Sequence, residues 1–147
     1  MDIQKLFACW IMLLLFATIT SCASQKEVAS PAEWKGNSIK FGKGGGFTGV
    51  SNMYVLLENG QLFSQDGLSS NYTALSKVSK KAAAALFKSA ALLSFPAADV
   101  NEPGNMYKEL QVTLPNKTIK LLWSDGNTTV NSDINNFHQQ LLLFIKK

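Results

Sequence analysis

Arginine is absent from this chain of 147 residues, so all 14 of its basic side chains are lysines. Arginine supplies the planar pair of donors that grips a phosphate or a guanine edge with two hydrogen bonds at once. A formal net charge of +4 that comes from lysine alone is not typical of a nucleic-acid-binding protein. We therefore expect no nucleic acid among the partners of this chain.

Histidine and cysteine are almost as scarce, with one histidine, His138, and two cysteines. A single histidine excludes a histidine pair that could hold zinc and excludes the H-E-x-x-H motif. Asp133 lies five residues before His138, off the ideal spacing for a shared helix face. We expect no metal, no cofactor and no catalytic residue, and we interpret His138 as a helical side chain at the boundary between core and surface. A hydrolase that relies on Asp, Glu and His138 is the third of three hypotheses.

The N-terminus carries an apolar run over residues 6–17, too short for a membrane-spanning helix, which needs roughly 20 apolar residues. The run is typical of the core of a secretory signal peptide. It is followed by Ile19-Thr20-Ser21-Cys22, which resembles the lipobox of bacterial lipoproteins. The resemblance implies that the Cys22 thiolate accepts a diacylglycerol and that cleavage occurs before it. The alternative is an ordinary secretory cleavage site with a cysteine nearby.

These observations predict a signal peptide over residues 1–21, a lipidated Cys22 with a flexible tether over 22–33, and one domain over 34–147. Cys9 lies in the segment that cleavage removes, and acylation would occupy the thiol of Cys22, so no free thiol would remain. Several acyl chains make release from a bilayer slow. Ala23 follows the cysteine, where an aspartate favours retention at the inner membrane of enteric bacteria. We therefore expect a lipid-anchored protein at the outer membrane of a Gram-negative bacterium.

Hydrophobic periodicity alternates between the strand and helix types after the tether. Strands are predicted over residues 38–41, 47–58, 61–64, 106–114 and 118–124, and helices over 75–93 and from Ser132-Asp133 to Ile145. The order is β-β-β-α-β-β-α. It predicts an α+β fold, with an antiparallel sheet of about five strands and two helices packed on one face.

Local signals predict where these elements begin and end. Gly42 to Gly46 is expected to end the first strand. Asn59-Gly60 lies between two apolar runs and predicts a type I′ hairpin turn, which requires positive φ at both residues. Ser79 or Ser76 is expected to cap the first helix.

The glycine-rich stretch Gly44-Gly45-Gly46-Phe47-Thr48-Gly49 formally matches G-x-G-x-x-G. A dinucleotide loop requires a helix after the glycines, whereas the residues after them here alternate like a strand, so we reject a dinucleotide site. Two interpretations stay open: the glycines allow positive φ in a tight hairpin or bulge, or the loop presents side chains to a partner. The candidate binding residues are Lys43, Gly44, Gly45, Gly46, Phe47 and Gly49, joined by Asn105 and Tyr107 from a second loop over residues 102–107.

A strand running into a G-G-G-F-T-G stretch, a middle helix, a hairpin and a final helix together resemble the emfourins, small bacterial inhibitors of thermolysin-like metalloproteases. The resemblance covers the layout from Ile39 to Ile145, and only the Gly45–Gly49 stretch is specific in sequence. The lipobox and tether depart from the family, and no inhibitory residue can be transferred. The chain also resembles lipoproteins of Bacteroidota.

The lipobox, the glycine-rich loop and the lack of catalytic groups together predict a membrane-tethered, non-catalytic binding module. The emfourin resemblance implies that this module inhibits a protease. The alternative is a structural or accessory envelope protein that docks to a larger assembly.

Overall fold

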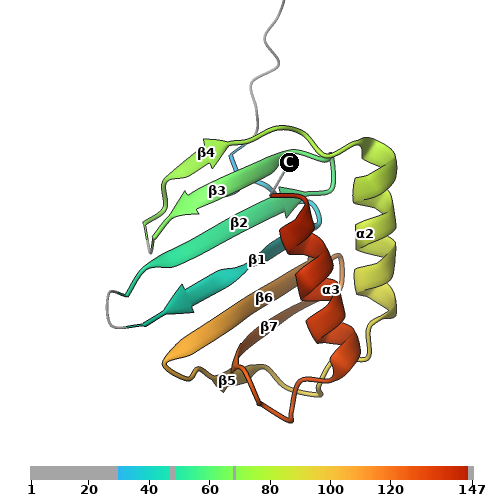
Figure 1. Ribbon diagram of the computed structural model, residues 1–147. Helices are drawn as coiled ribbons and strands as arrows, with labels where there is room; N and C mark the ends of the chain where they lie inside the picture. The colour runs from blue at the N-terminus through green and yellow to red at the C-terminus, as the bar shows by residue number, and fades with distance from the viewer. Residues whose placement is uncertain (1–29, 47–48, 68, 146–147) are drawn as a thin grey trace, which may run out of the picture.

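The computed structural model describes residues 30–46, 49–67 and 69–145. The predictions for the signal peptide, for Cys22 and for Phe47 concern residues outside these ranges. The described residues form an α+β fold, as the sequence predicts, in which a twisted sheet carries two helices (Figure 1).

The sheet has seven strands among the described residues, in the spatial order β4-β3-β2-β1-β6-β7-β5. The strands are β1 (Ser38–Gly45), β2 (Ser51–Leu57), β3 (Leu62–Asp66), β4 (Tyr72–Ala74), β5 (Val100–Glu102), β6 (Met106–Leu114) and β7 (Lys117–Ser124). The helices are α2 (Lys80–Leu92) and α3 (Ser132–Leu143).

The predicted five-stranded antiparallel sheet is wrong in two details. β4 and β5 are three-residue strands at opposite edges of the sheet, too short to give a periodic signal. β5 pairs with β7 in parallel, whereas all other pairs are antiparallel. β1 lies at the centre, between β2 of its own hairpin and β6. A pairing of such distant segments cannot be read from local pattern.

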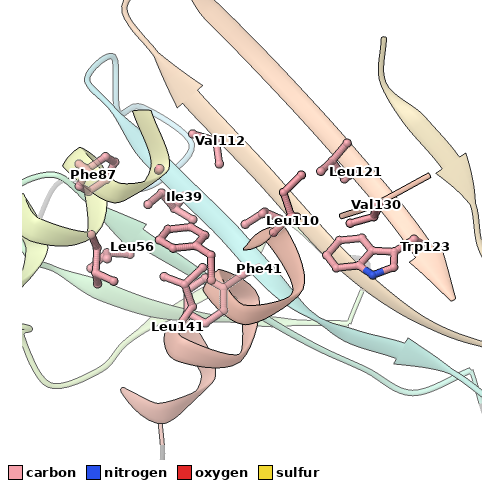
Figure 2. Packing of buried hydrophobic residues seen from close by; sticks show 14 of the residues in the cluster. Ile39, Phe41, Leu56, Phe87, Leu110, Val112, Leu121, Trp123, Val130 and Leu141 are labelled. Carbon is pink, nitrogen blue, oxygen red and sulfur yellow. The ribbon is translucent and has the colours of Figure 1, made fainter. Parts of the chain in front are cut away.

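One face of the sheet carries the main core, to which both helices contribute. Because side chains alternate along a strand, Ile39 and Phe41 share a face with their register partners Val112 and Leu110. Figure 2 shows these side chains packed together with Leu141 of α3 and Phe87 of α2. The full set of buried core residues is Ile39, Phe41, Leu56, Leu62, Leu86, Phe87, Ala90, Val100, Leu110, Val112, Leu121, Trp123, Val130, Ile134, Phe137 and Leu141.

The opposite face carries a smaller apolar cluster of Val55, Leu57 and Phe63, against which Trp34 and Tyr72 pack. The alternation along β2 explains the two clusters, since Leu56 belongs to the main core and both of its neighbours to the smaller one.

The two helices begin at polar caps. Ser79 caps α2 by accepting a hydrogen bond from the backbone N–H of Ala82, which confirms one of the two predicted caps. α3 is capped by Asn131, whose Oδ1 accepts from the N–H of Ile134 at 3.0 Å, directly before the predicted start at Ser132-Asp133. The predicted first helix begins too early, at Leu75. The backbone N–H of Leu75 instead donates to the carbonyl of Leu62 and continues the pairing of the sheet.

The β2–β3 hairpin does not use a type I′ turn, because no described residue other than glycine has a positive φ. The N–H of Gly60 bonds to the carbonyl of Leu57, and Asn59 Oδ1 accepts from the N–H of Gln61 at 2.8 Å. Only Gly60 has a positive φ, of 87°. This is a three-residue loop in which a turn ends on a left-handed glycine, so the prediction of a hairpin is confirmed and the predicted turn type is wrong.

Candidate functional site

The structure brings together two of the segments that the sequence marks as candidate binding loops. The glycines do not end the first strand as predicted, since β1 continues through Gly45. Gly44 is the register partner of Tyr107, and Gly45 that of Met106. The N–H of Gly46 then donates to the carbonyl of Asn105 at 2.6 Å. Candidate residues from segments that are distant along the chain therefore lie at one end of the sheet.

Close approach to the second segment explains why glycine occupies these positions. At Gly44, an added Cβ would lie 2.5 Å from the Tyr107 hydroxyl. At Gly45, φ is +100° and an added Cβ would lie 2.2 Å from the backbone oxygen of Asn105, a contact that rotating a side chain cannot relieve. Gly46 and Gly49 also have positive φ. The interpretation that the glycines allow positive φ is thus confirmed at Gly45, Gly46 and Gly49, whereas Gly44 has no positive φ.

The same end of the sheet exposes two large apolar side chains that sequence reasoning missed. Val50 is 58% exposed and Met106 is 55% exposed. Val50 precedes Ser51 and Met106 precedes Tyr107, and Ser51 and Tyr107 are both register partners of Gly44. We call Gly46, Gly49, Val50, Asn105 and Met106 the glycine-turn surface.

Lys43 belongs to a neighbouring feature, a half-open groove between α3 and the sheet. Its volume is about 360 Å³, in the range of small-ligand sites. The residues that line it are Lys43, Asn52, Tyr54, Gln139, Leu142, Leu143 and Ile145. Lys43 and Asn52 are register partners on β1 and β2, and Tyr54 stacks on buried Phe41 with ring centroids 5.8 Å apart. Of the lining residues, only Lys43 was a candidate from sequence, because the others meet only once α3 packs on the sheet.

A second lysine lies next to Lys43 on the neighbouring strand, and its ammonium group belongs to a network of polar side chains. Lys108 is the register partner of Lys43 on β6. Its ammonium group forms an ion pair with Asp125 and hydrogen-bonds to Asn135 Oδ1 at 3.3 Å. The hydrogen bond and the charge of Lys108 lower the pKa of Asp125 below its usual value. The same Asn135 oxygen accepts from Trp123 Nε1 at 3.1 Å, so one amide joins α3 to β6 and β7.

His138 is fully buried, so its predicted position at the boundary between core and surface is wrong. Its Nε2 lies 2.9 Å from the backbone oxygen of Gly42. Because a carbonyl only accepts, Nε2 carries the hydrogen and Nδ1 is the bare nitrogen. Among the described residues Nδ1 has no hydrogen-bond partner, and the ring packs edge-on against Trp123 at 5.3 Å.

The pKa of His138 is lowered to about 4 from the usual 6.5, chiefly by burial and also by the charges of Lys43 and Lys108, against the opposing effect of the Gly42 hydrogen bond. The imidazole is therefore neutral at pH 7 and does not reach solvent.

Within residues 30–46, 49–67 and 69–145, no three His, Cys, Asp or Glu side chains gather where they could hold a metal ion. No helix of the described part of the chain is long and apolar enough to cross a membrane. No protein-family model matches the chain, and no curated protein matches it either.

Proposed function

We propose that this chain is a lipid-anchored envelope lipoprotein of a Gram-negative bacterium whose folded domain binds a protein partner and performs no catalysis. The observation that carries the binding function is the glycine-turn surface, where Val50 and Met106 are exposed at the end of a tightly hydrogen-bonded sheet. The proposed anchor is Cys22, and the proposed signal peptide covers residues 1–21.

The lipid anchor is supported by the order of features at the N-terminus. An apolar run, the sequence Ile19-Thr20-Ser21 and then Cys22 succeed one another as lipoprotein processing requires. The tether after the cysteine is small and polar, with Pro31, as is typical of a flexible linker.

The binding function is supported by the backbone hydrogen bonding of Gly46 as well as by the apolar side chains of the surface. A preformed surface loses little conformational entropy when it binds, so its apolar contacts contribute more to affinity. Gly46 is tied to Asn105 by a backbone hydrogen bond, and the Met106 sulfur lies 3.3 Å from where a Cβ on Gly46 would be. A thioether adapts well to an apolar partner surface. Gly46 and Gly49 of this surface belong to the emfourin-like G-G-F-T-G stretch of the sequence, which supports a thermolysin-like protease as the partner to test first.

The anchor is tested by mass spectrometry of the N-terminal peptide and by fractionation of cells. We expect wild-type protein in the membrane fraction, with an acylated N-terminal cysteine, and Cys22→Ser in the soluble fraction or unprocessed. Cys9→Ser is the matched control and should behave as wild type. Recovery of an intact Met1 with an unmodified Cys22 thiol would refute the anchor.

The binding function is tested with the chain from Ala23 onward. A cooperative unfolding transition first establishes that this chain folds, and the chain is then titrated into a thermolysin-like protease. Unchanged proteolysis at high micromolar concentration rules out inhibition of that enzyme. Crosslinking and pull-down from solubilised envelope then tests the accessory alternative, which predicts a stable membrane partner and no protease.

In either experiment, Met106→Asp should weaken binding about tenfold or more if Met106 is central to the interface. Leu92→Asp is the matched control, because Leu92 is 76% exposed on α2. Equal binding by the two variants would refute the glycine-turn surface as the interface.

A further inference from the structure

The groove between α3 and the β1–β2 hairpin has one charged end and an apolar floor. Lys43 and Asn52 are exposed at its rim, and Leu142 and Ile145 are half-buried within it. We propose that the groove binds a single-chain aliphatic carboxylate, with the carboxylate on Lys43 and the chain along α3. The groove is separate from the glycine-turn surface, so this binding depends neither on the lipid anchor nor on a protein partner.

The charge at the rim favours an anion. The two ion pairs among the described residues join Lys40 to Glu109 and Lys108 to Asp125, and Lys43 belongs to neither. Lys108, its cross-strand neighbour, already has Asp125 to balance its charge. A ligand with one negative charge would therefore meet one lysine that has no carboxylate partner among the described residues, while an aliphatic amine would be repelled by it.

Hydrogen bonding favours a carboxylate among the anions. The Asn52 side chain makes no hydrogen bond to the other described residues and lies on the same cross-strand rung as Lys43. An ammonium and an amide together can satisfy the two oxygens of a carboxylate. A phosphate, with more charge and three acceptor oxygens, is bound in proteins by several donors or by arginine, and this rim offers neither.

The floor of the groove favours an aliphatic chain over a polar body. Leu142 and Ile145 pack against the core at its edge, and Leu143 is 61% exposed beside them. The last turn of α3 and the residues directly after it therefore present three aliphatic side chains to the groove. Each methylene that leaves water in such a place tightens binding by about fourfold when it is fully enclosed.

The test uses the full chain in nanodiscs of zwitterionic lipid, with methyl-labelled leucine and isoleucine, titrated with butanoate, hexanoate and hexanamide. We expect hexanoate to shift the methyl resonances of Leu142 and Ile145 saturably. Hexanoate should bind about fourfold or more tighter than butanoate because of its two added methylenes. Hexanamide, the neutral analogue, should bind about threefold or more weakly than hexanoate, as expected for one exposed ion pair.

Two pairs of variants isolate the groove from general adsorption. Lys43→Gln should bring the affinity for hexanoate down to that for hexanamide, while Lys88→Gln, at an exposed lysine on α2, should not. Leu143→Ser should weaken both ligands, whereas Leu92→Ser should weaken neither. Because all four positions are exposed, folding should survive, and the wild-type methyl spectrum away from each site verifies that it does.

Three results would overturn the proposal. The first is the absence of a saturable shift at Leu142 and Ile145. The second is equal affinity for hexanoate and hexanamide, or no effect of Lys43→Gln. The third is a shift of equal size at Leu92, which would mean that the acids adsorb to the protein at large.

Discussion

The buried imidazole of His138 makes the stability of this fold depend on pH in a way that can be calculated from the structure. The pKa of His138 is lowered to about 4 in the fold, from 6.5 in an exposed histidine. As the pH falls below 6.5, the unfolded chain takes up a proton that the folded chain resists, so the folded state loses relative stability. Above pH 6.5 the ring is neutral in both states and contributes no pH dependence.

The size of the effect is set by the shift in pKa. Each pKa unit corresponds to about 1.4 kcal/mol, so the shift from 6.5 to about 4 amounts to roughly 3 kcal/mol of lost stability. The loss begins near pH 6.5 and is complete below about pH 4. Out of a typical total of about 5–15 kcal/mol for a domain, this is a large fraction.

Urea unfolding monitored by tryptophan fluorescence between pH 7 and pH 4 measures this loss. His138→Gln is the comparison, because its amide can still donate to the carbonyl of Gly42 but does not titrate. Carboxylates such as Asp125 titrate in both proteins, so the difference between the two pH profiles isolates the imidazole.

We expect wild type to lose about 3 kcal/mol more than the variant over this range. Because His138 is the one histidine of the chain, its ring protons give an unambiguous NMR titration. A folded-state pKa near 6.5, or identical pH profiles for the two proteins, would contradict this account of the buried ring.

Three further changes test the local structure by urea unfolding at pH 7. Gly45→Ala should destabilise the fold by about 2–3 kcal/mol more than Gly49→Ala. Both substitutions place an alanine at a positive φ, but only at Gly45 would the new Cβ meet a backbone oxygen. Equal losses of stability would contradict this. Asn135→Ala should cost about 1–3 kcal/mol, because it leaves the indole N–H of Trp123 without its acceptor, and an unchanged midpoint would mean that water replaces the amide. Ser79→Ala should cost about 1 kcal/mol by removing the cap of α2, with a decrease in helical circular dichroism on heating; no change in either would exclude a role for the cap.

Local sequence pattern predicted the elements that are long and periodic. The α+β class, the main strands and both helices can be inferred from alternation over β6 and β7 and from the apolar stripes of α2 and α3. The positive φ of Gly45, Gly46 and Gly49 was inferred on the same local basis. These predictions succeed because side-chain periodicity and backbone sterics are set by residues a few positions apart.

The tertiary structure decided everything that depends on distant segments. β5 is recognisable as a strand only where it pairs with β7, and His138 is buried only because α3 covers β1. The groove joins residues of β1 and β2 to the C-terminal end of α3 and to Ile145 beyond it, so no local sequence pattern indicates it. A chain fixes its own local conformations, but pairing and burial are properties of surfaces that meet only when the whole chain has folded.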